Sequence, residues 1–232
     1  MDLRGIGAAL VDLVLPGDCA GCGAPVPPWC PQCGGELGPP TRPHLPGGPV
    51  VLAAGRYTGP LRSALLRYKE RGRRDLAGPL GALLAAVLDD AFGPAPVWLV
   101  PAPSRPAAAR VRGGDHVARL CRAVAARRSG ARVARPLRLA RRARDSVGLD
   151  AEQRAANLAG RVRVRPAALP DGAAGAGAVL LVDDVVTTGA TLRTCHDALA
   201  AAGVAVAAAV VLCDATKPVD HERRAIVPLR LS

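Results

Sequence analysis

Two adjacent carboxylates and the small, hydroxyl-bearing residues that follow them are the part of this sequence best suited to chemistry. Asp183 and Asp184 close an apolar run at 178–182 that is typical of a strand buried on both faces. The residues beyond them are Thr187, Thr188, Gly189, Ala190 and Thr191. Carboxylates at the end of a parallel strand suit sugar hydroxyls or a hydrated cation, and a loop before a helix suits a phosphate. The pattern predicts a site for a ribose 5-phosphate.

Two other phosphate-binding arrangements also begin with an apolar strand. A nucleotide hydrolase needs a Gly-x4-Gly-Lys-Ser/Thr loop, but neither Lys69 nor Lys217, the only lysines, precedes Ser or Thr. A dinucleotide-binding fold needs its glycines after the strand, whereas the glycines at 172–177 come before it. Both alternatives therefore fit the sequence less well.

A second candidate site lies near the N-terminus. Its four cysteines have the spacing C-x2-C-x7-C-x2-C: Cys19, Cys22, Cys30 and Cys33. Each C-x2-C pair can present two thiolates to one tetrahedral ion, and four protein ligands leave no position for a substrate. The spacing predicts a structural zinc site, with an iron site or redox pairs as alternatives. The other cysteines, at 121, 195 and 213, lie among apolar residues and are predicted to be core side chains.

The composition limits what else the chain could be. Its 232 residues suffice for one main domain with a small appendage. No apolar stretch approaches the ~20 residues of a membrane helix, and Asp12 interrupts the first apolar region, so we expect a cytoplasmic protein without membrane insertion. The net charge of +12 suits a polyphosphate ligand or a nucleic acid, although arginine-rich usage alone would also produce it.

Hydrophobic periodicity and Gly/Pro positions predict elements that alternate between helix and strand. Helices are expected at 1–15, 61–68, 76–91 and 117–128, from about 151, and from about 192. Strands are expected at 50–54, 97–100, 131–139, 161–165, 178–182 and 204–212, and the Gly/Pro-rich stretch 34–50 is expected to be a linker. This order indicates an α/β fold with a mostly parallel sheet of about five strands flanked by helices.

The stretch from Val182 to Thr191 resembles the phosphoribosyl pyrophosphate (PRPP) signature of type I phosphoribosyltransferases. The order of the cysteine pattern, Tyr57-x-Gly59, Lys69-x2-Gly72 and this stretch narrows the resemblance to the ComF family. These are bacterial phosphoribosyltransferase-like proteins with an N-terminal zinc finger, linked in some bacteria to DNA uptake. The resemblance implies a type I phosphoribosyltransferase-like domain over 49–232, preceded by a helix, a zinc knuckle and a linker over 1–48.

The resemblance also assigns roles to individual residues. It implies an Mg²⁺-dependent enzyme that transfers phosphoribosyl from PRPP to an unidentified acceptor and releases pyrophosphate. Asp183, Asp184 and Lys69 would be catalytic, and the two carboxylates would hold the ribose hydroxyls. PRPP would be bound by Asp183, Asp184, Thr187, Thr188, Gly189, Ala190, Thr191, Lys69 and Arg112. The arginines after Lys69 would help to offset the charge of the leaving pyrophosphate.

The sequence departs from the family pattern at two places. Gly114, Asp115 and His116 stand where Phe-Asn-Gln is usual, and Ser146 stands where Gln is usual. We expect His116 to be an exposed loop residue, with an acid or base role as the alternative. Asp150 suits the cap of the helix expected from 151.

Two other classes of function fit the same residues. The chain could be a PRPP- or nucleotide-sensing adaptor that binds single-stranded DNA or the DNA-uptake machinery through its zinc knuckle and basic surface. It could also be a scaffold that keeps the loop without the chemistry. The chain has only five aromatic residues, which argues against a base-stacking surface, and an oligomer is compatible with the sequence.

Overall fold

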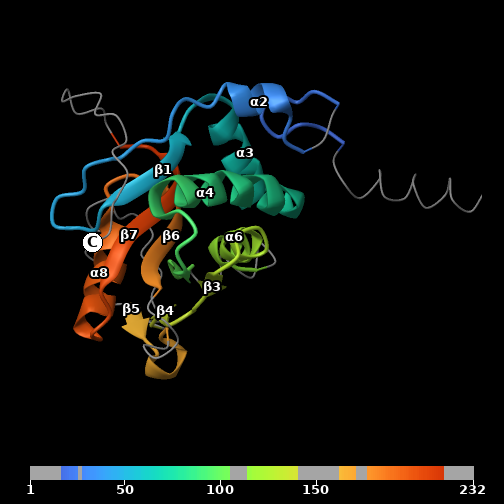
Figure 1. Cartoon of the computed structure of the whole chain (residues 1–232). Coiled ribbons are helices and arrows are strands. Elements are labelled where there is room, and N and C mark those ends of the chain that lie inside the picture. The colour runs from blue at the N-terminus through green and yellow to red at the C-terminus, as the bar shows by residue number, and fades with distance from the viewer. Residues whose placement is uncertain (1–16, 26–27, 105–113, 141–161, 171–176, 217–232) are drawn as a thin grey trace, which may run out of the picture.

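The computed structural model describes residues 17–25, 28–104, 114–140, 162–170 and 177–216, which include one central sheet and the helices around it (Figure 1). The described parts contain the strands β1 (Val51–Arg56), β2 (Val97–Pro101), β3 (Ala131–Val133), β4 (Leu137–Leu139), β5 (Val162–Val164), β6 (Ala178–Val186) and β7 (Val206–Asp214). Their α-helices are α2 (Pro31–Gly35), α3 (Gly59–Glu70), α4 (Ala77–Phe92), α6 (His116–Ala125) and α8 (Ala190–Ala201). Two short 3₁₀ helices, η1 (Arg74–Leu76) and η2 (Pro166–Ala168), complete the set.

The central sheet has five strands in the order β1-β7-β6-β2-β3, and all of them are parallel. β6 lies in the middle, paired with β2 from Val97↔Ala178 to Pro101↔Val182 and with β7 as far as Val186↔Asp214. A strand with neighbours on both sides and helices on both faces needs an unbroken apolar run. The sequence of β6 supplies that run up to Val182.

Three helices cover one face of the sheet. α3 and α4 connect β1 to β2, and α6 connects β2 to β3. Leucines of these helices, among them Leu65, Leu84 and Leu120, pack with Leu99 and Leu180 of the sheet in one buried cluster. Figure 1 shows α3, α4 and α6 together on this side of the sheet.

The opposite face has a single helix among the described residues. α8 packs on it through Leu192, Cys195 and Leu199, and Leu45 joins the same buried cluster from the chain before β1. A separate antiparallel pair formed by β4 and β5 contributes Leu137 and Val162. This face is therefore built from segments of different kinds.

Most predicted elements are confirmed, and three are corrected. The strand expected at 131–139 is two strands, β3 in the main sheet and β4 paired with β5. β6 continues beyond 182 to Val186, because Asp183 and its neighbours keep their pairing with β7. The stretch 34–50 is more than a linker, since Thr41 pairs with Ala53 of β1 and Leu45 is buried.

Some predictions fall on residues that the structure does not describe. The helices expected at 1–15 and from 151, the cap at Asp150, Ser146 and Arg112 lie outside the described residues. Within the described ranges, none of the helices has the length and apolar character needed to cross a membrane. The predicted α/β fold, with a parallel sheet flanked by helices and a cysteine cluster at the N-terminal end, is confirmed.

Candidate functional site

Asp183 and Asp184 lie inside β6, close to its C-terminal end, and face opposite sides of the sheet. Successive side chains of a strand point to opposite faces. Asp184 faces the helices α3 and α6, where it meets Lys69 and His116. Asp183 faces α8, where its charge adds to the effect of burial in raising the pKa of the Cys195 thiol. The two carboxylates therefore have different surroundings.

Asp184 accepts two hydrogen bonds on one oxygen. Lys69 Nζ lies 2.7 Å and His116 Nε2 lies 2.6 Å from Oδ2 of Asp184. Burial of Asp184, which is 3% exposed, opposes its charged form, but the bond from His116 and the ammonium of Lys69 outweigh it and lower the pKa of this carboxyl. Asp184 is therefore a carboxylate at neutral pH, held by groups from two helices.

Asp183 has the opposite electrostatic environment. Burial, followed by the charge of Asp184, raises the pKa of Asp183 to about 7. Its Oδ1 accepts one hydrogen bond, from the backbone N–H of Asp184 at 2.8 Å. Asp183 is therefore protonated in a part of the molecules near neutral pH. A cation or a ligand hydroxyl close to the carboxyl would favour its charged form. We name Asp183, Asp184, Lys69 and His116 the carboxylate site.

The loop at 187–191 follows directly and leads into α8. Thr187 and Thr188 are exposed, and Gly189 is the N-cap residue of α8 with a φ of +72°. A Cβ atom at Gly189 would lie 1.9 Å from Leu45 Cδ1, so this position needs glycine both for its backbone angle and for the close approach of Leu45. The first N–H groups of a helix have no partner within that helix, so the start of α8 can bind an anion beside Thr187 and Thr188.

The arginines after Lys69 do not all remain available to a ligand. Arg73 is 5% exposed and makes ion pairs with Asp75 at 2.9 Å and with Asp18 at 2.8 Å. Arg67 also pairs with Asp18. The sequence prediction that this basic segment meets pyrophosphate is therefore wrong for Arg73, because a buried guanidinium must be neutralised by nearby carboxylates.

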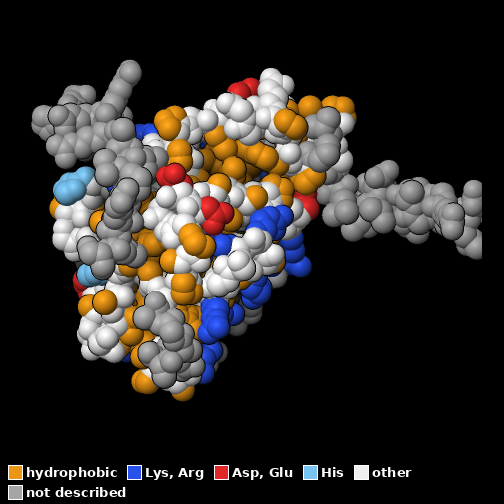
Figure 2. All heavy atoms as spheres, viewed as in Figure 1, with side chains coloured by type: hydrophobic (Ala, Val, Ile, Leu, Met, Phe, Trp, Pro, Cys, Tyr) orange, Lys and Arg blue, Asp and Glu red, His pale blue; other side chains and the backbone are white. Residues whose placement is uncertain are grey.

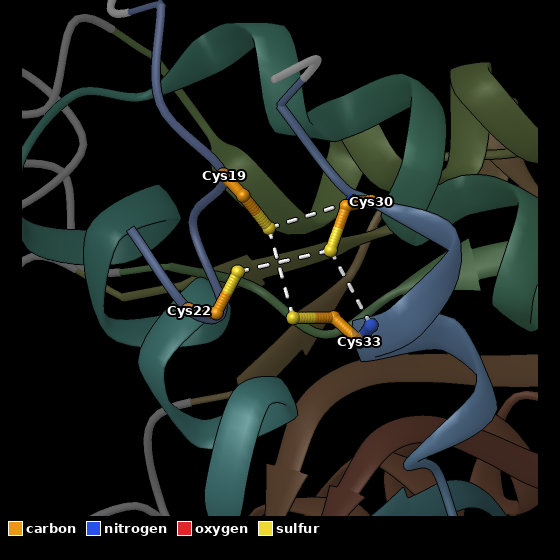
Figure 3. A group of neighbouring side chains, drawn as sticks. All are labelled: Cys19, Cys22, Cys30 and Cys33. Carbon is orange, nitrogen blue, oxygen red and sulfur yellow. Dashed lines mark hydrogen bonds between the residues drawn. The ribbon is translucent and has the colours of Figure 1, made fainter. Parts of the chain in front are cut away.

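The four predicted cysteine ligands form one cluster, the cysteine cluster (Figure 3). Their Sγ atoms all lie within 4.8 Å of one another, and the pairs Cys19–Cys33 and Cys22–Cys30 are each 3.7 Å apart. A tetrahedral zinc ion with Zn–S bonds of ~2.3 Å would place its sulfur ligands about 3.8 Å apart. The pairs Cys19–Cys33 and Cys22–Cys30 therefore have the spacing that a zinc ion requires.

Hydrogen bonds to sulfur support the same interpretation. The backbone N–H of Cys30 donates to Cys19 Sγ and that of Cys33 donates to Cys30 Sγ, both at 3.4 Å. Burial works against the thiolate of Cys19, but N–H groups of Cys22, Cys30 and Gly21 outweigh it and lower its pKa to about 6. Burial and the neighbouring sulfurs raise the pKa of Cys33. A divalent cation would remove this conflict by favouring the thiolate at every position.

The structure brings the predicted residues into two groups. Lys69 meets Asp184 at the end of β6, whereas Asp183 faces the other side of the sheet. Residues 187–189 follow directly, and Ala190 and Thr191 are the first residues of α8. His116 is a correction, because it is 4% exposed at the first position of α6 instead of exposed in a loop. Its spacing with Leu120 and Val124, at i+4 and i+8, was the available signal for burial.

A separate groove of about 480 Å³ lies between β5 and α8. None of the predicted site residues that the structure describes lines it. Its walls are Val162, Arg163, Val164, Thr194, Asp197, Ala198, Ala201 and Ala202. The groove is therefore distinct from the carboxylate site.

Comparison with known proteins gives a family match that includes Asp183 and Asp184. Residues 143–229, less than half of the chain, match the family model described as phosphoribosyl transferase domain. This stretch contains β6, the 187–191 loop, α8 and β7. The C-terminal part of the chain is similar to a phosphoribosyl transferase domain. No curated protein sequence matches the chain.

Solved structures with a similar arrangement include two hypoxanthine phosphoribosyltransferases. The protein from Staphylococcus aureus is 17% identical over 66% of this chain and 70% of its own, with a TM-score of 0.33. The protein from Trypanosoma cruzi is 17% identical over 69% of this chain and 72% of its own, with a TM-score of 0.34.

Proposed function

We propose that this protein binds PRPP at the carboxylate site and transfers its phosphoribosyl group to an acceptor nucleophile, releasing pyrophosphate. One observation carries the proposal: the carboxylates of β6 are followed within a few residues by an exposed Thr187–Thr188 pair and by the N-terminus of α8. A ribose 5-phosphate carries vicinal hydroxyls and a phosphate, which are the groups that carboxylates and the start of a helix can bind. The phosphoribosyl transferase domain match over 143–229 supports the same ligand class.

Each part of the site would act mainly through electrostatics. As pyrophosphate leaves, positive charge develops on the ribose ring, and the carboxylates of Asp183 and Asp184 would stabilise it. The 187–191 loop would hold the 5-phosphate. Lys69 carries the charge needed to offset pyrophosphate, and its side chain is 27% exposed although its ammonium contacts Asp184. Mg²⁺ bound with PRPP would use oxygen donors, which the carboxylate of Asp183 can supply.

We further propose that the chain is a ComF-type protein and that its cysteine cluster holds a structural zinc ion. The cluster supplies four sulfur ligands at tetrahedral spacing, and Asp18, next to Cys19, pairs with Arg67 on α3 and with Arg73. Zinc would therefore stabilise the segment that packs on the helix carrying Lys69.

Calorimetric titration of the zinc-loaded protein with PRPP, with and without Mg²⁺, tests the proposal. We expect Mg²⁺-dependent binding, and pyrophosphate release when the correct nucleobase or amine is present. The double variant Asp183→Asn/Asp184→Asn should lose binding because it keeps the volume and removes the charge. Asp197→Asn, at an exposed carboxylate of α8, is the matched control and should bind as the wild type does. Loss of binding in both variants, or in neither, contradicts the assignment.

A second function, as an adaptor for single-stranded DNA, is favoured by one surface. Figure 2 shows Lys and Arg side chains gathered along the side of the molecule where α6 and β3 lie. The exposed arginines of this region are Arg122, Arg127, Arg132, Arg135 and Arg138. Binding to this surface would be insensitive to base sequence and would weaken steeply with salt. Fluorescence anisotropy with labelled oligonucleotides at increasing salt, together with PRPP binding without pyrophosphate release, would favour the adaptor over the enzyme.

A further inference from the structure

His116 is the least expected member of the carboxylate site, and its position is fixed from several sides. It is the first residue of α6, and the N-cap Asp115 accepts a hydrogen bond from Ala118 N at 3.1 Å. The Tyr68 hydroxyl donates to the backbone carbonyl of His116 at 2.8 Å. Only 5% of the imidazole side chain is exposed. A ring held in this way has little freedom to turn away from Asp184.

The polarity of this ring is not explained by core packing. Nδ1 of His116 is buried and has no hydrogen-bond partner among the described residues, so a polar atom is kept there without compensation. An aliphatic side chain would avoid that cost. The imidazole makes one interaction that an aliphatic side chain could not make. This is the hydrogen bond from Nε2 to Asp184 Oδ2, at 2.6 Å. Because Asp184 is a carboxylate, Nε2 of His116 is the donor in this bond and carries a hydrogen.

The two groups that contact Asp184 Oδ2 differ in their freedom. Lys69 has a flexible four-carbon stem, lies in the last turn of α3 and is 27% exposed. His116 is 5% exposed and sits in the first turn of α6. An arriving polyphosphate attracts the ammonium strongly, and Lys69 can turn toward it. His116 has no comparable path, so it would remain on Asp184.

We infer that His116 is a positioning residue that holds the Asp184 side chain oriented toward the ribose when Lys69 moves to the phosphates. The inference rests on the proposed function, since it takes Asp184 as a ligand of PRPP. It gives Lys69 and His116 separate tasks. Lys69 neutralises Asp184 before the ligand arrives, and His116 holds the carboxylate afterwards.

Three variants test the inference through PRPP affinity in the presence of Mg²⁺. His116→Ala removes the donor, and we expect affinity to fall about ten- to a hundred-fold, the value of one hydrogen bond to a charged group. His116→Gln restores a neutral N–H donor and should recover most of that loss. Tyr68→Phe removes the hydroxyl that donates to the backbone carbonyl of His116 but leaves the imidazole in place, so it should have a smaller effect. Unfolding curves of each variant show whether it is folded.

The outcomes separate this inference from the proposed function. No binding of PRPP by the wild-type protein would overturn the proposed function and this inference with it. Wild-type binding that persists unchanged in a folded His116→Ala variant would overturn the positioning role alone. Equal losses in His116→Gln and His116→Ala would also overturn it, because the donor would then not be the feature that matters.

A spectroscopic measurement gives a readout that a purely structural role would not change. Imidazole ¹⁵N shifts of the wild-type protein, assigned by comparison with His116→Gln, should show the Nε2–H tautomer at this residue. The Nε2 shift should move on Asp184→Asn. It should stay in place when saturating PRPP and Mg²⁺ are added, because the bond persists after Lys69 leaves. Loss of the Nε2–H signature on ligand addition would overturn the inference.

Discussion

The two candidate sites of this protein are assembled in opposite ways. The cysteine cluster takes all its ligands from residues 19–33, and backbone N–H groups of the same segment contact the sulfurs. The carboxylate site takes Lys69 from α3, His116 from α6 and Asp184 from β6, and His116 and Asp184 are 68 positions apart. A local site is specified by spacing, whereas an assembled site depends on every element that brings its parts together.

The two sites nevertheless meet on α3. Asp18 precedes the first cysteine ligand and pairs with Arg67, two residues before Lys69. Gly21 lies against the other end of α3, because a Cβ there would come 2.9 Å from Pro60 Cβ. The segment that carries the cysteine cluster therefore contacts both ends of the helix that carries Lys69. Perturbing one site at a time tests the contrast between them.

Removal of the metal should have the largest effect. Without an ion the four thiols compete for charge, so we expect chelation, or the variant Cys19→Ser, to lower the free energy of unfolding of the N-terminal segment by several kcal/mol. Metal analysis should give one zinc per chain before treatment. Cys121→Ala, in the core of α6, is the control and should keep the full zinc content. A chelated protein with an unchanged melting curve would mean that the cluster does not support the fold.

Gly189→Ala should have the second largest effect, because it strains the loop next to the carboxylate site. The new methyl would need a left-handed backbone, which costs ~1–2 kcal/mol, and would also collide with Leu45. Gly203→Ala is a matched control with a φ of +78° and nothing within 4 Å of its Cβ, so it carries only the backbone cost. Gly189→Ala should be the more destabilising in urea, and Leu45→Ala added to it should recover part of the difference.

The pH response should distinguish the two carboxylates. The raised pKa of Asp183, about 7, means that the folded protein holds this proton more tightly than the unfolded chain does. Its contribution to stability is complete below the pKa of the unfolded carboxyl, ~3.9, and is lost as the pH rises toward about 7. The melting temperature of the wild type should therefore fall relative to Asp183→Asn between about pH 4 and about pH 7. A constant difference would contradict the shift.

The pH dependence of PRPP binding should also report the proton on Asp183. Bound Mg²⁺ favours the charged form of Asp183, so the wild type should release protons on binding at neutral pH and bind more tightly as the pH rises through about 7. Calorimetry in buffers of different ionisation enthalpy measures this release. It should be reduced in Asp183→Asn, where any binding that remains involves one fewer titrating group.

Asp18→Asn should have the smallest effect. Its side chain is 35% exposed, so the ion pairs to Arg67 and Arg73 are partly screened and each contributes modestly. Burial opposes the charged form of Asp18 less than Arg67 favours it, and the net result is a lowered pKa of this carboxyl. We expect full zinc content and PRPP affinity reduced by no more than about three-fold. A large loss of affinity would show that the two sites are coupled more tightly than these contacts suggest.

Local sequence patterns predicted more of this structure than they could predict of its long-range contacts. Apolar periodicity located β6 but ended it at 182, because burial patterns do not record the backbone pairing that carries the strand past Asp183 to Val186. The cysteine spacing was sufficient because its geometry is local. The contact of His116 with Asp184 was missed because it joins α6 to β6, and no feature near His116 in the sequence encodes that distance.

Leu45 shows the same limit in an apolar residue. Its neighbours in the sequence are rich in Gly and Pro and give no sign of burial. In the fold it lies against Gly189, more than a hundred positions away. No periodic pattern surrounds it, and only the packed structure reveals its role. Residue types and spacing therefore indicate the chemistry that each site could offer, while packing decides which additional side chains lie beside it.

The contact between Leu45 and Gly189 has a practical consequence for expressing parts of this protein. A fragment that starts at residue 49, where the sequence suggests a domain boundary, would lack Leu45 and the Thr41–Ala53 pairing on β1. Its 187–191 loop would be open on the side that Leu45 covers in the whole chain. Loss of activity in such a fragment would thus reflect the absence of Leu45 beside the loop. It would not measure the effect of removing a metal ion from the cysteine cluster.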